Sequence, residues 1–150
     1  MKNRIFVVLS IVFLGILFCG CTKDNNLQNE VVWKKVYTKW GATSAKVRLQ
    51  MKRYTIIKST SSVLCYKGKN DIKAISYKFV NDSLCAVIVM AENEHISVDE
   101  VRKSFSSYES LGEYESNELF VDVGQNTLFT IASCEGGGRN YLSIGYAAVQ

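Results

Sequence analysis

A pattern of apolar residues that occurs twice, about 54 residues apart, sets the strongest limit on the fold of this chain. In each copy a hydroxyl residue is followed four positions later by valine and then by two further apolar residues: Thr43, Val47, Met51 and Tyr54, and Ser97, Val101, Phe105 and Tyr108. This spacing places apolar side chains on one face of a helix, and a Ser or Thr at the helix start can accept hydrogen bonds from the first backbone N–H groups. The pattern therefore predicts a short helix at the start of each copy.

Strand-like runs follow each predicted helix at matching offsets, at residues 63–67, 72–80 and 84–91 and at residues 117–122, 127–134 and 141–149. Turn-forming residues at 81–83 and 135–138 separate the last two runs of each copy, which is typical of hairpins. We therefore predict a single α+β domain over residues 31–150. The domain would have two layers, an antiparallel sheet and a layer of both helices on one face of that sheet. The chain order would be a tandem αβββ–αβββ repeat, with one copy at about residues 41–94 and the other at 95–150.

Two features of this predicted fold stay open. The copies share spacing but little side-chain identity, so chance coincidence is the alternative to a repeat. Residues 31–40 fit an amphipathic helix through Trp33, Tyr37 and Trp40, while their β-branched residues fit an edge strand equally well. The run 84–91 is apolar on both faces, which favours a central position in the sheet.

The N-terminus has the layout of a secretory signal. Residues 1–4 carry two positive charges, and an apolar run of about fourteen residues follows at 5–18. This run is shorter than the roughly 20 residues that cross a membrane. Gly20 then supplies the small residue that a lipobox needs before Cys21, whereas a bulky residue precedes Cys19. The sequence therefore predicts a signal peptide that ends at residue 20 and a lipid on Cys21.

Cleavage before Cys21 would leave an acylated cysteine and a polar tether, residues 21–30, that hold the domain on a membrane. The expected location is the cell envelope, at the outer membrane. The alternative is an uncleaved segment that spans the membrane once, for which the apolar run is short.

The two halves of the predicted domain carry opposite charge. Residues 31–80 contain twelve Lys and Arg against one acid, and residues 81–150 contain three Lys and Arg against eleven acids. The basic half would either face an anionic partner, such as lipid headgroups, lipopolysaccharide phosphates or an acidic protein, or attract the acidic half within the fold. Apolar residues are interleaved with the cations, so the chain has no disordered basic arm of the kind that binds nucleic acid.

The residues best suited to contact such a partner lie on the first predicted helix and next to it. They are the cations Lys46, Arg48, Lys52 and Arg53 and the aromatic residues Trp33, Tyr37 and Trp40. We therefore predict a non-enzymatic binding or accessory module that needs neither a metal nor a cofactor.

The segment Gly41-Ala42-Thr43-Ser44-Ala45-Lys46-Val47, followed by three predicted strands, resembles the SmpA/OmlA lipoproteins and the β-lactamase-inhibitor proteins. With Trp40 before it, the segment also resembles small, uncharacterised lipoproteins of Bacteroidota. The resemblance rests on the motif G-x-T-x-x-x-V and on element order over residues 40–149. It implies a domain that binds other macromolecules and performs no chemistry. A second hypothesis is therefore an inhibitor-like module that caps a partner enzyme through aromatic anchors.

A third hypothesis is an unrecognised hydrolase. It would need His95, the lone histidine, beside Cys85, Cys134 or an acid in space. Cys65 makes the number of cysteines in the domain odd, so at most one disulfide could form among the three. The absence of a C-x-x-C pair from the sequence argues against a zinc site.

One short motif suggests a covalent modification. Asp82-Ser83-Leu84 resembles the three-residue O-glycosylation sequence of exported Bacteroidota proteins, with Ser83 as the acceptor. A plain hairpin turn is the alternative explanation of these residues.

The predicted lipid anchor can be tested by feeding labelled palmitate to cells that produce the chain. Label should enter the wild-type protein and the Cys19→Ser variant but not the Cys21→Ser variant, because only Cys21 follows a small residue. Label that persists in Cys21→Ser, or an unlabelled wild-type protein in the soluble fraction, would contradict the anchor.

Overall fold

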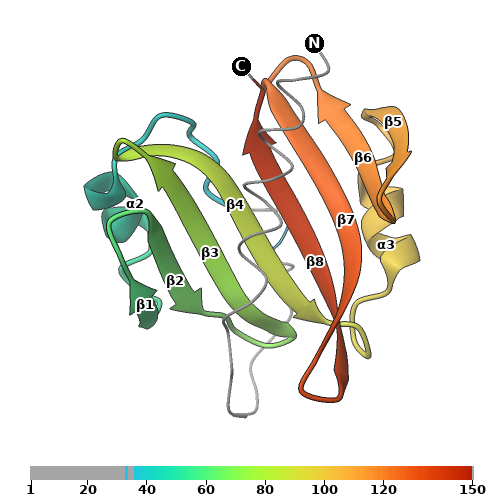
Figure 1. Cartoon of the computed structure of the whole chain (residues 1–150), viewed down its shortest axis with the longest axis horizontal. Helices are drawn as coiled ribbons and strands as arrows, with labels where there is room; N and C mark the ends of the chain where they lie inside the picture. The colour runs from blue at the N-terminus through green and yellow to red at the C-terminus, as the bar shows by residue number, and fades with distance from the viewer. Residues whose placement is uncertain (1–32, 34–35, 150) are drawn as a thin grey trace.

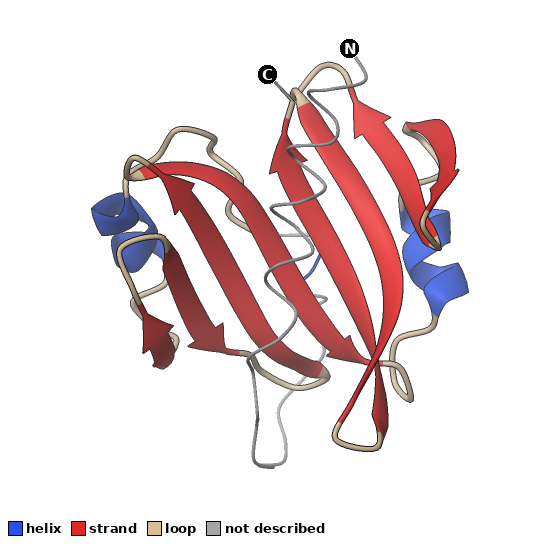
Figure 2. Ribbon diagram, viewed as in Figure 1, coloured by secondary structure: helices blue, strands red, loops and turns tan. Residues whose placement is uncertain are grey.

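The computed structural model describes residue 33 and residues 36–149, which form one antiparallel sheet of eight strands and two short helices (Figures 1 and 2). In chain order these elements are α2 (Ser44–Gln50), β1 (Ile56–Ser59), β2 (Val63–Lys67), β3 (Ile72–Val80), β4 (Ser83–Glu92), α3 (Val98–Ser104), β5 (Glu109–Tyr114), β6 (Asn117–Asp122), β7 (Thr127–Gly136) and β8 (Arg139–Ala148). The predicted signal peptide and tether, residues 1–30, lie outside the described residues.

The order of strands across the sheet is β1-β2-β3-β4-β8-β7-β6-β5. Each half of the chain is thus a helix followed by four consecutive strands, and the halves join where β4 pairs with β8, from Ala86 opposite Ala147 to Glu92 opposite Tyr141. Because each half contributes its fourth strand to this junction, the first strands, β1 and β5, lie at the two opposite ends of the sheet (Figure 1).

The predicted α+β class is wrong, because the described residues form a mainly β fold. The two helices are only seven residues long, and they lie near opposite ends of the sheet without forming a covering layer (Figure 2). The predicted αβββ unit missed two strands, β1 and β5. Side chains of these strands are exposed on both faces of the sheet, so their sequences lack the alternation of apolar and polar residues that identifies a half-buried strand.

The starts of both helices and the six predicted strands do occur close to the expected positions. Thr43 and Ser97 are the N-caps, and the side chain of each accepts a hydrogen bond from the backbone N–H three residues later. Val47 and Val101 are fully buried, as the apolar spacing indicated. The segment at residues 36–40 forms neither the helix nor the edge strand considered for it.

The main core is rich in aromatic side chains. The ring of Phe105, at the C-terminal end of α3, lies near five other rings, with centroid separations of 4.8 to 6.4 Å: Trp33, Tyr108, Phe120, Phe129 and Tyr146. Tyr146 on β8 also donates a hydrogen bond from its hydroxyl to the backbone carbonyl of Trp33. These contacts join α3 and the segment before α2 to the centre of the sheet.

A second, smaller cluster of buried residues brings together β4, β6, β7 and β8: Ala86, Ile88, Leu119, Leu128 and Ala147. Residues of β4 therefore enter both clusters, since Val87 and Val89 belong to the main core while Ala86 and Ile88 belong to the smaller one. This two-sided burial agrees with the central position predicted for residues 84–91.

A matched pair of valine substitutions tests the packing of α3. Val101→Ala should lower the free energy of unfolding by roughly 2 kcal/mol, because it removes two buried methyl groups and leaves a cavity. Val123→Ala should change it by less than about 0.5 kcal/mol, since Val123 is 70% exposed. Urea denaturation measures both values, and equal values for the two variants would contradict the burial of α3.

Candidate binding surfaces at the ends of the sheet

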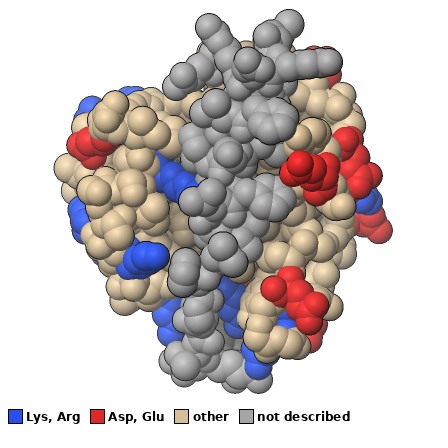
Figure 3. Space-filling model, viewed as in Figure 1, with Lys and Arg blue, Asp and Glu red and all other residues tan. Residues whose placement is uncertain are grey.

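The end of the sheet formed by α2 and β1, called here the basic end, gathers exposed cations: Lys46, Arg48, Lys52, Arg53 and Lys58. Val47 of α2 faces the core and Met51 is buried at the C-cap, so the residues between and beside them point to solvent. All four cations that the sequence singled out are therefore exposed at the same end of the sheet. Figure 3 shows blue side chains mostly on the side of the molecule that holds β1 to β3.

One side-chain contact links the two elements of the basic end. Arg48 Nη2 of α2 donates a hydrogen bond of 2.7 Å to Ser59 Oγ at the end of β1. The contact places the guanidinium beside the edge strand, so the charge of the helix and the edge of the sheet form one surface.

The basic end also exposes large apolar side chains. Leu49 on α2 is 65% exposed, and Ile56 and Ile57 on β1 are 40% and 43% exposed. Scattered exposed apolar residues are normal on proteins. Here three of them lie within nine residues of sequence among five cations, which gives the surface a mixed basic and apolar character.

The aromatic residues predicted to contact a partner belong mainly to the fold. Trp33 is fully buried in the main core, so its assignment to a contact surface is corrected here. Tyr37 and Trp40 are half-buried against the same core. The indole Nε1 of Trp40 donates a hydrogen bond of 2.9 Å to Thr127 Oγ1 at the start of β7. The sequence showed that these residues were apolar but could not show which way they face.

The opposite end of the sheet, formed by α3 and β5 and called here the acidic end, carries exposed carboxylates: Asp99, Glu100, Glu109, Glu113 and Glu115. Leu111 on β5 is 47% exposed among them. In Figure 3 red side chains gather on the side that holds β5 and β6.

Seven strand spacings of about 4.8 Å separate β1 from β5 along the sheet. This distance is roughly 30 Å, or several Debye lengths at physiological salt. The two charged ends therefore do not neutralise each other within one molecule.

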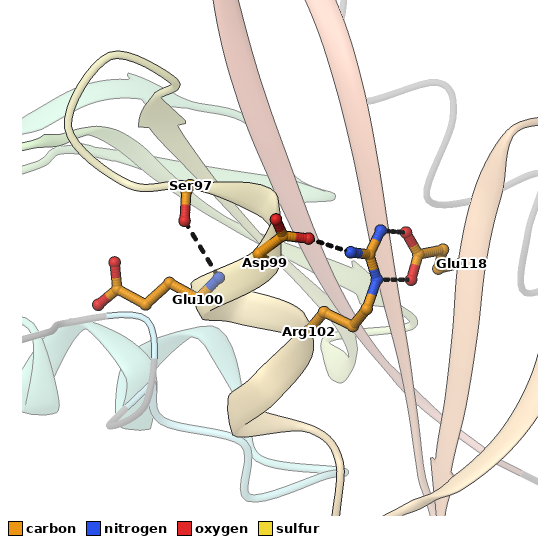
Figure 4. A network of polar contacts seen from close by, with 5 residues as sticks. All are labelled: Ser97, Asp99, Glu100, Arg102 and Glu118. Atoms are coloured by element: carbon orange, nitrogen blue, oxygen red, sulfur yellow. Dashed lines mark hydrogen bonds and ion pairs between the residues drawn. The ribbon is translucent and has the colours of Figure 1, made fainter.

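A network of ion pairs fixes α3 on β6 at the acidic end (Figure 4). The guanidinium of Arg102 makes two parallel contacts with the carboxylate of Glu118, one of them 2.7 Å from Nε to Oε2, and a further ion pair with Asp99. Hydrogen bonds from Arg102 lower the pKa of Glu118 below its ordinary value. The arrangement orients the helix and leaves the other acids of this end exposed.

The turn between β3 and β4 contains the candidate glycosylation motif. Asn81 and Asp82 form the tip with positive φ angles, and Ser83 already belongs to β4 and is half-buried. Asp82 Oδ1 accepts a hydrogen bond of 2.9 Å from the backbone N–H of Ser44. Hydrogen bonding from the Ser44 side chain, and then from this N–H, lowers the pKa of the Asp82 carboxyl. Asp82 thus has a structural role at the start of α2, and modification of Ser83 stays a prediction.

Of the residues considered for a hydrolase, His95 lies beside an acid, and Cys85 and Cys134 lie at opposite ends of the sheet's central strands. His95 is exposed, with Nε2 3.9 Å from Glu92 Oε2. Cys85 lies near the opposite end of β4 from Glu92, about seven residues or roughly 20 Å along the strand. Cys134 on β7 lies in the same row of the sheet as Glu92, because both are paired with Tyr141 of β8. Among the described residues, Cys65, Cys85 and Cys134 form no disulfide. Within the described part of the chain, no three His, Cys, Asp or Glu side chains gather as a metal site would require.

One cluster could not be anticipated from the sequence. Glu92 at the end of β4 meets Lys73 of β3 at 2.5 Å, Arg139 of β8 at 3.6 Å and His95 at 3.9 Å. A hydrogen bond from Lys73 is the main cause that lowers the pKa of Glu92. Lys73, Glu92 and Arg139 are far apart in sequence and are brought together by strand pairing, whereas His95 is only three residues from Glu92.

Comparisons with known proteins find no match among family models, curated proteins or solved structures. The described helices include none with the length and apolar character to cross a membrane.

The Arg102–Glu118 contact predicts a dependence of stability on pH. Because the pKa of Glu118 is lowered from its ordinary 4.5, the contact stabilises the fold above that pH and is lost as the pH falls through the lower folded-state value. Glu118→Gln should therefore melt at a slightly lower temperature than the wild type at pH 7, and the difference should vanish in acid. Glu94→Gln, at an exposed position, is the control. A difference that grows in acid would contradict this assignment.

Proposed function

We propose that this protein is a non-enzymatic binding module of the cell envelope, held at a membrane by lipid on Cys21, whose basic end contacts an anionic surface. The observation that carries the proposal is the gathering of Lys46, Arg48, Lys52 and Arg53, all exposed, at one end of the sheet. Anionic lipid headgroups attract such a cluster with about 1 kcal/mol per Lys or Arg near the surface.

The apolar residues of the basic end support the same proposal. A surface that lies on a membrane combines cations, which meet the headgroups, with apolar side chains, which enter the boundary of the acyl chains. Leu49, Ile56 and Ile57 are exposed beside the cations and can serve this purpose.

The predicted anchor and the basic end would act together. Several acyl chains on one cysteine would anchor the protein stably, and the basic end would add an electrostatic contact with anionic headgroups. The predicted tether, residues 22–30, could extend about 30 Å at most. This length would allow the domain to turn its basic end toward the membrane.

The other two hypotheses have less support. An inhibitor-like module would bind tightly through exposed aromatic anchors near the centre of its interface, yet Trp33 is buried and Trp40 is held by Thr127. A hydrolase would need an activated nucleophile beside His95, yet Cys85 lies near the far end of β4, and burial raises the pKa of the Cys134 thiol, which disfavours its thiolate. A weak, salt-dependent contact with an anionic surface suits the observed basic end better than tight inhibition of an enzyme or hydrolysis does.

A pair of double variants with equal change in charge tests the proposed contact. Lys52→Gln/Arg53→Gln should weaken binding to vesicles of anionic phospholipid by about thirtyfold, because two contributions of about 1 kcal/mol each are lost. Lys103→Gln/Arg139→Gln removes the same charge from exposed positions outside the basic end and should change binding little. Both variants carry Cys21→Ser to exclude the lipid, and co-sedimentation with vesicles measures binding.

Two results would contradict this proposal. One is equal loss of binding in both double variants, which would show an effect of net charge alone. The other is binding that persists unchanged in high salt or on vesicles of purely zwitterionic lipid, since screening weakens contacts between exposed charges.

A further inference from the structure

Both ends of the eight-stranded sheet are open to a further strand. β1 and β5 each have a neighbouring strand on one side only within the part of the chain that the structure describes. All four residues of β1 are exposed, and so are five of the six residues of β5. A strand at the end of a sheet presents backbone N–H and C=O groups that can pair with another chain.

The two open ends differ in charge in a way that selects their partner. β1 carries Lys58 and is flanked by the cations of α2 and of residues 52–53. β5 carries Glu109 and Glu113 and is followed by Glu115, while the acids and bases of α3 balance each other. Like charges face each other if two β1 strands or two β5 strands meet, which costs several kcal/mol across an interface. Opposite charges face each other only if β1 meets β5.

The direction of the strands favours the same pairing. Every neighbouring pair in the sheet is antiparallel, and β1 and β5 occupy the first and eighth positions, so they run in opposite directions. A second molecule shifted along the sheet, without being turned over, therefore places its β1 antiparallel to β5 of the first. The antiparallel alternation continues, and the same face of each sheet stays on the same side.

We infer that copies of this chain associate head to tail, with β1 of one molecule alongside β5 of the next. Ile56 and Ile57 on β1 and Leu111 on β5 add exposed apolar area to the contact. Each edge strand also contains an irregularity, between Ile56 and Lys58 and between Ser110 and Gly112, which shortens the regular ladder. The contact is therefore small, weak and driven by charge, and such a head-to-tail contact builds open chains or rings.

This association goes beyond the proposed function and uses a different partner for the basic end. Binding to an anionic membrane and pairing with β5 both occupy Lys58 and its neighbours. The experiment below contains no membrane, so its failure would leave the proposed membrane contact untouched.

A zero-length carbodiimide reagent, which joins lysine amines to nearby carboxylates, tests the inference on the purified full-length protein in detergent. Wild-type protein should give a ladder of multimers at low salt, with peptides from residues 46–58 joined to peptides from residues 109–115. The ladder should disappear at high salt because the contact depends on exposed charges. Multimers without this pair of peptides would overturn the inference.

Two charge-reversal variants give the sharper test. Arg53→Glu/Lys58→Glu places acids on and beside β1, so that both edge strands are acidic, and Glu109→Lys/Glu113→Lys places lysines on β5, so that both edge strands are basic. Each variant alone should lose cross-linked multimers by more than about tenfold, because like charges then face each other. Mixed together, the two should form cross-linked pairs again, since β5 of the first variant and β1 of the second are unchanged.

Thermal melting of each variant controls for folding. Glu113 faces Glu118 across β5 and β6, so its replacement by lysine removes a like-charge pair and should not destabilise the sheet. Folded variants whose mixture gives no cross-linked pairs would overturn head-to-tail pairing. If one variant unfolds, the peptide map of the wild type and its salt dependence still decide the question.

Discussion

The pairing of β4 with β8 is the interaction on which the rest of this structure depends. Seven residue pairs, from Ala86 with Ala147 to Glu92 with Tyr141, join two halves that are each a helix and a four-stranded meander. β4 contributes side chains to both buried clusters, so the junction is stabilised on two faces as well as by its backbone hydrogen bonds. Without it, the chain would have two small sheets, each with an additional open edge.

The same pairing decides where the charge of the chain lies. Since the junction uses the last strand of each half, the first strands and their helices are carried to the two ends of one sheet. The basic sequence of the first half and the acidic sequence of the second thus become separate surfaces, too far apart for strong attraction at physiological salt. A domain with one basic and one acidic end is suited to contacts with charged neighbours, which is the basis of both proposals made here.

Local signals in the sequence were sufficient to locate a helix or strand where one face of that element, or both faces, are buried. The caps at Thr43 and Ser97, the buried valines of both helices and six strands followed from periodicity. β1 and β5 could not be found this way, because their side chains are exposed on both faces, and the fold class was mistaken as a result. Trp33 was assigned to the surface because an apolar pattern does not show which direction the core lies. The cations of the basic end were identified correctly as exposed, since charged side chains rarely become buried.

The most direct test of this account is a set of backbone nuclear Overhauser effects between β4 and β8. Protons of facing residues in an antiparallel pair are close, since their Cα atoms are about 4.5 to 5.5 Å apart. We predict cross-strand effects that join Ile88 to Gly145 and Met90 to Ser143, in the observed register. Effects that join β8 to β1 instead would place β1 in the middle of the sheet and contradict the account.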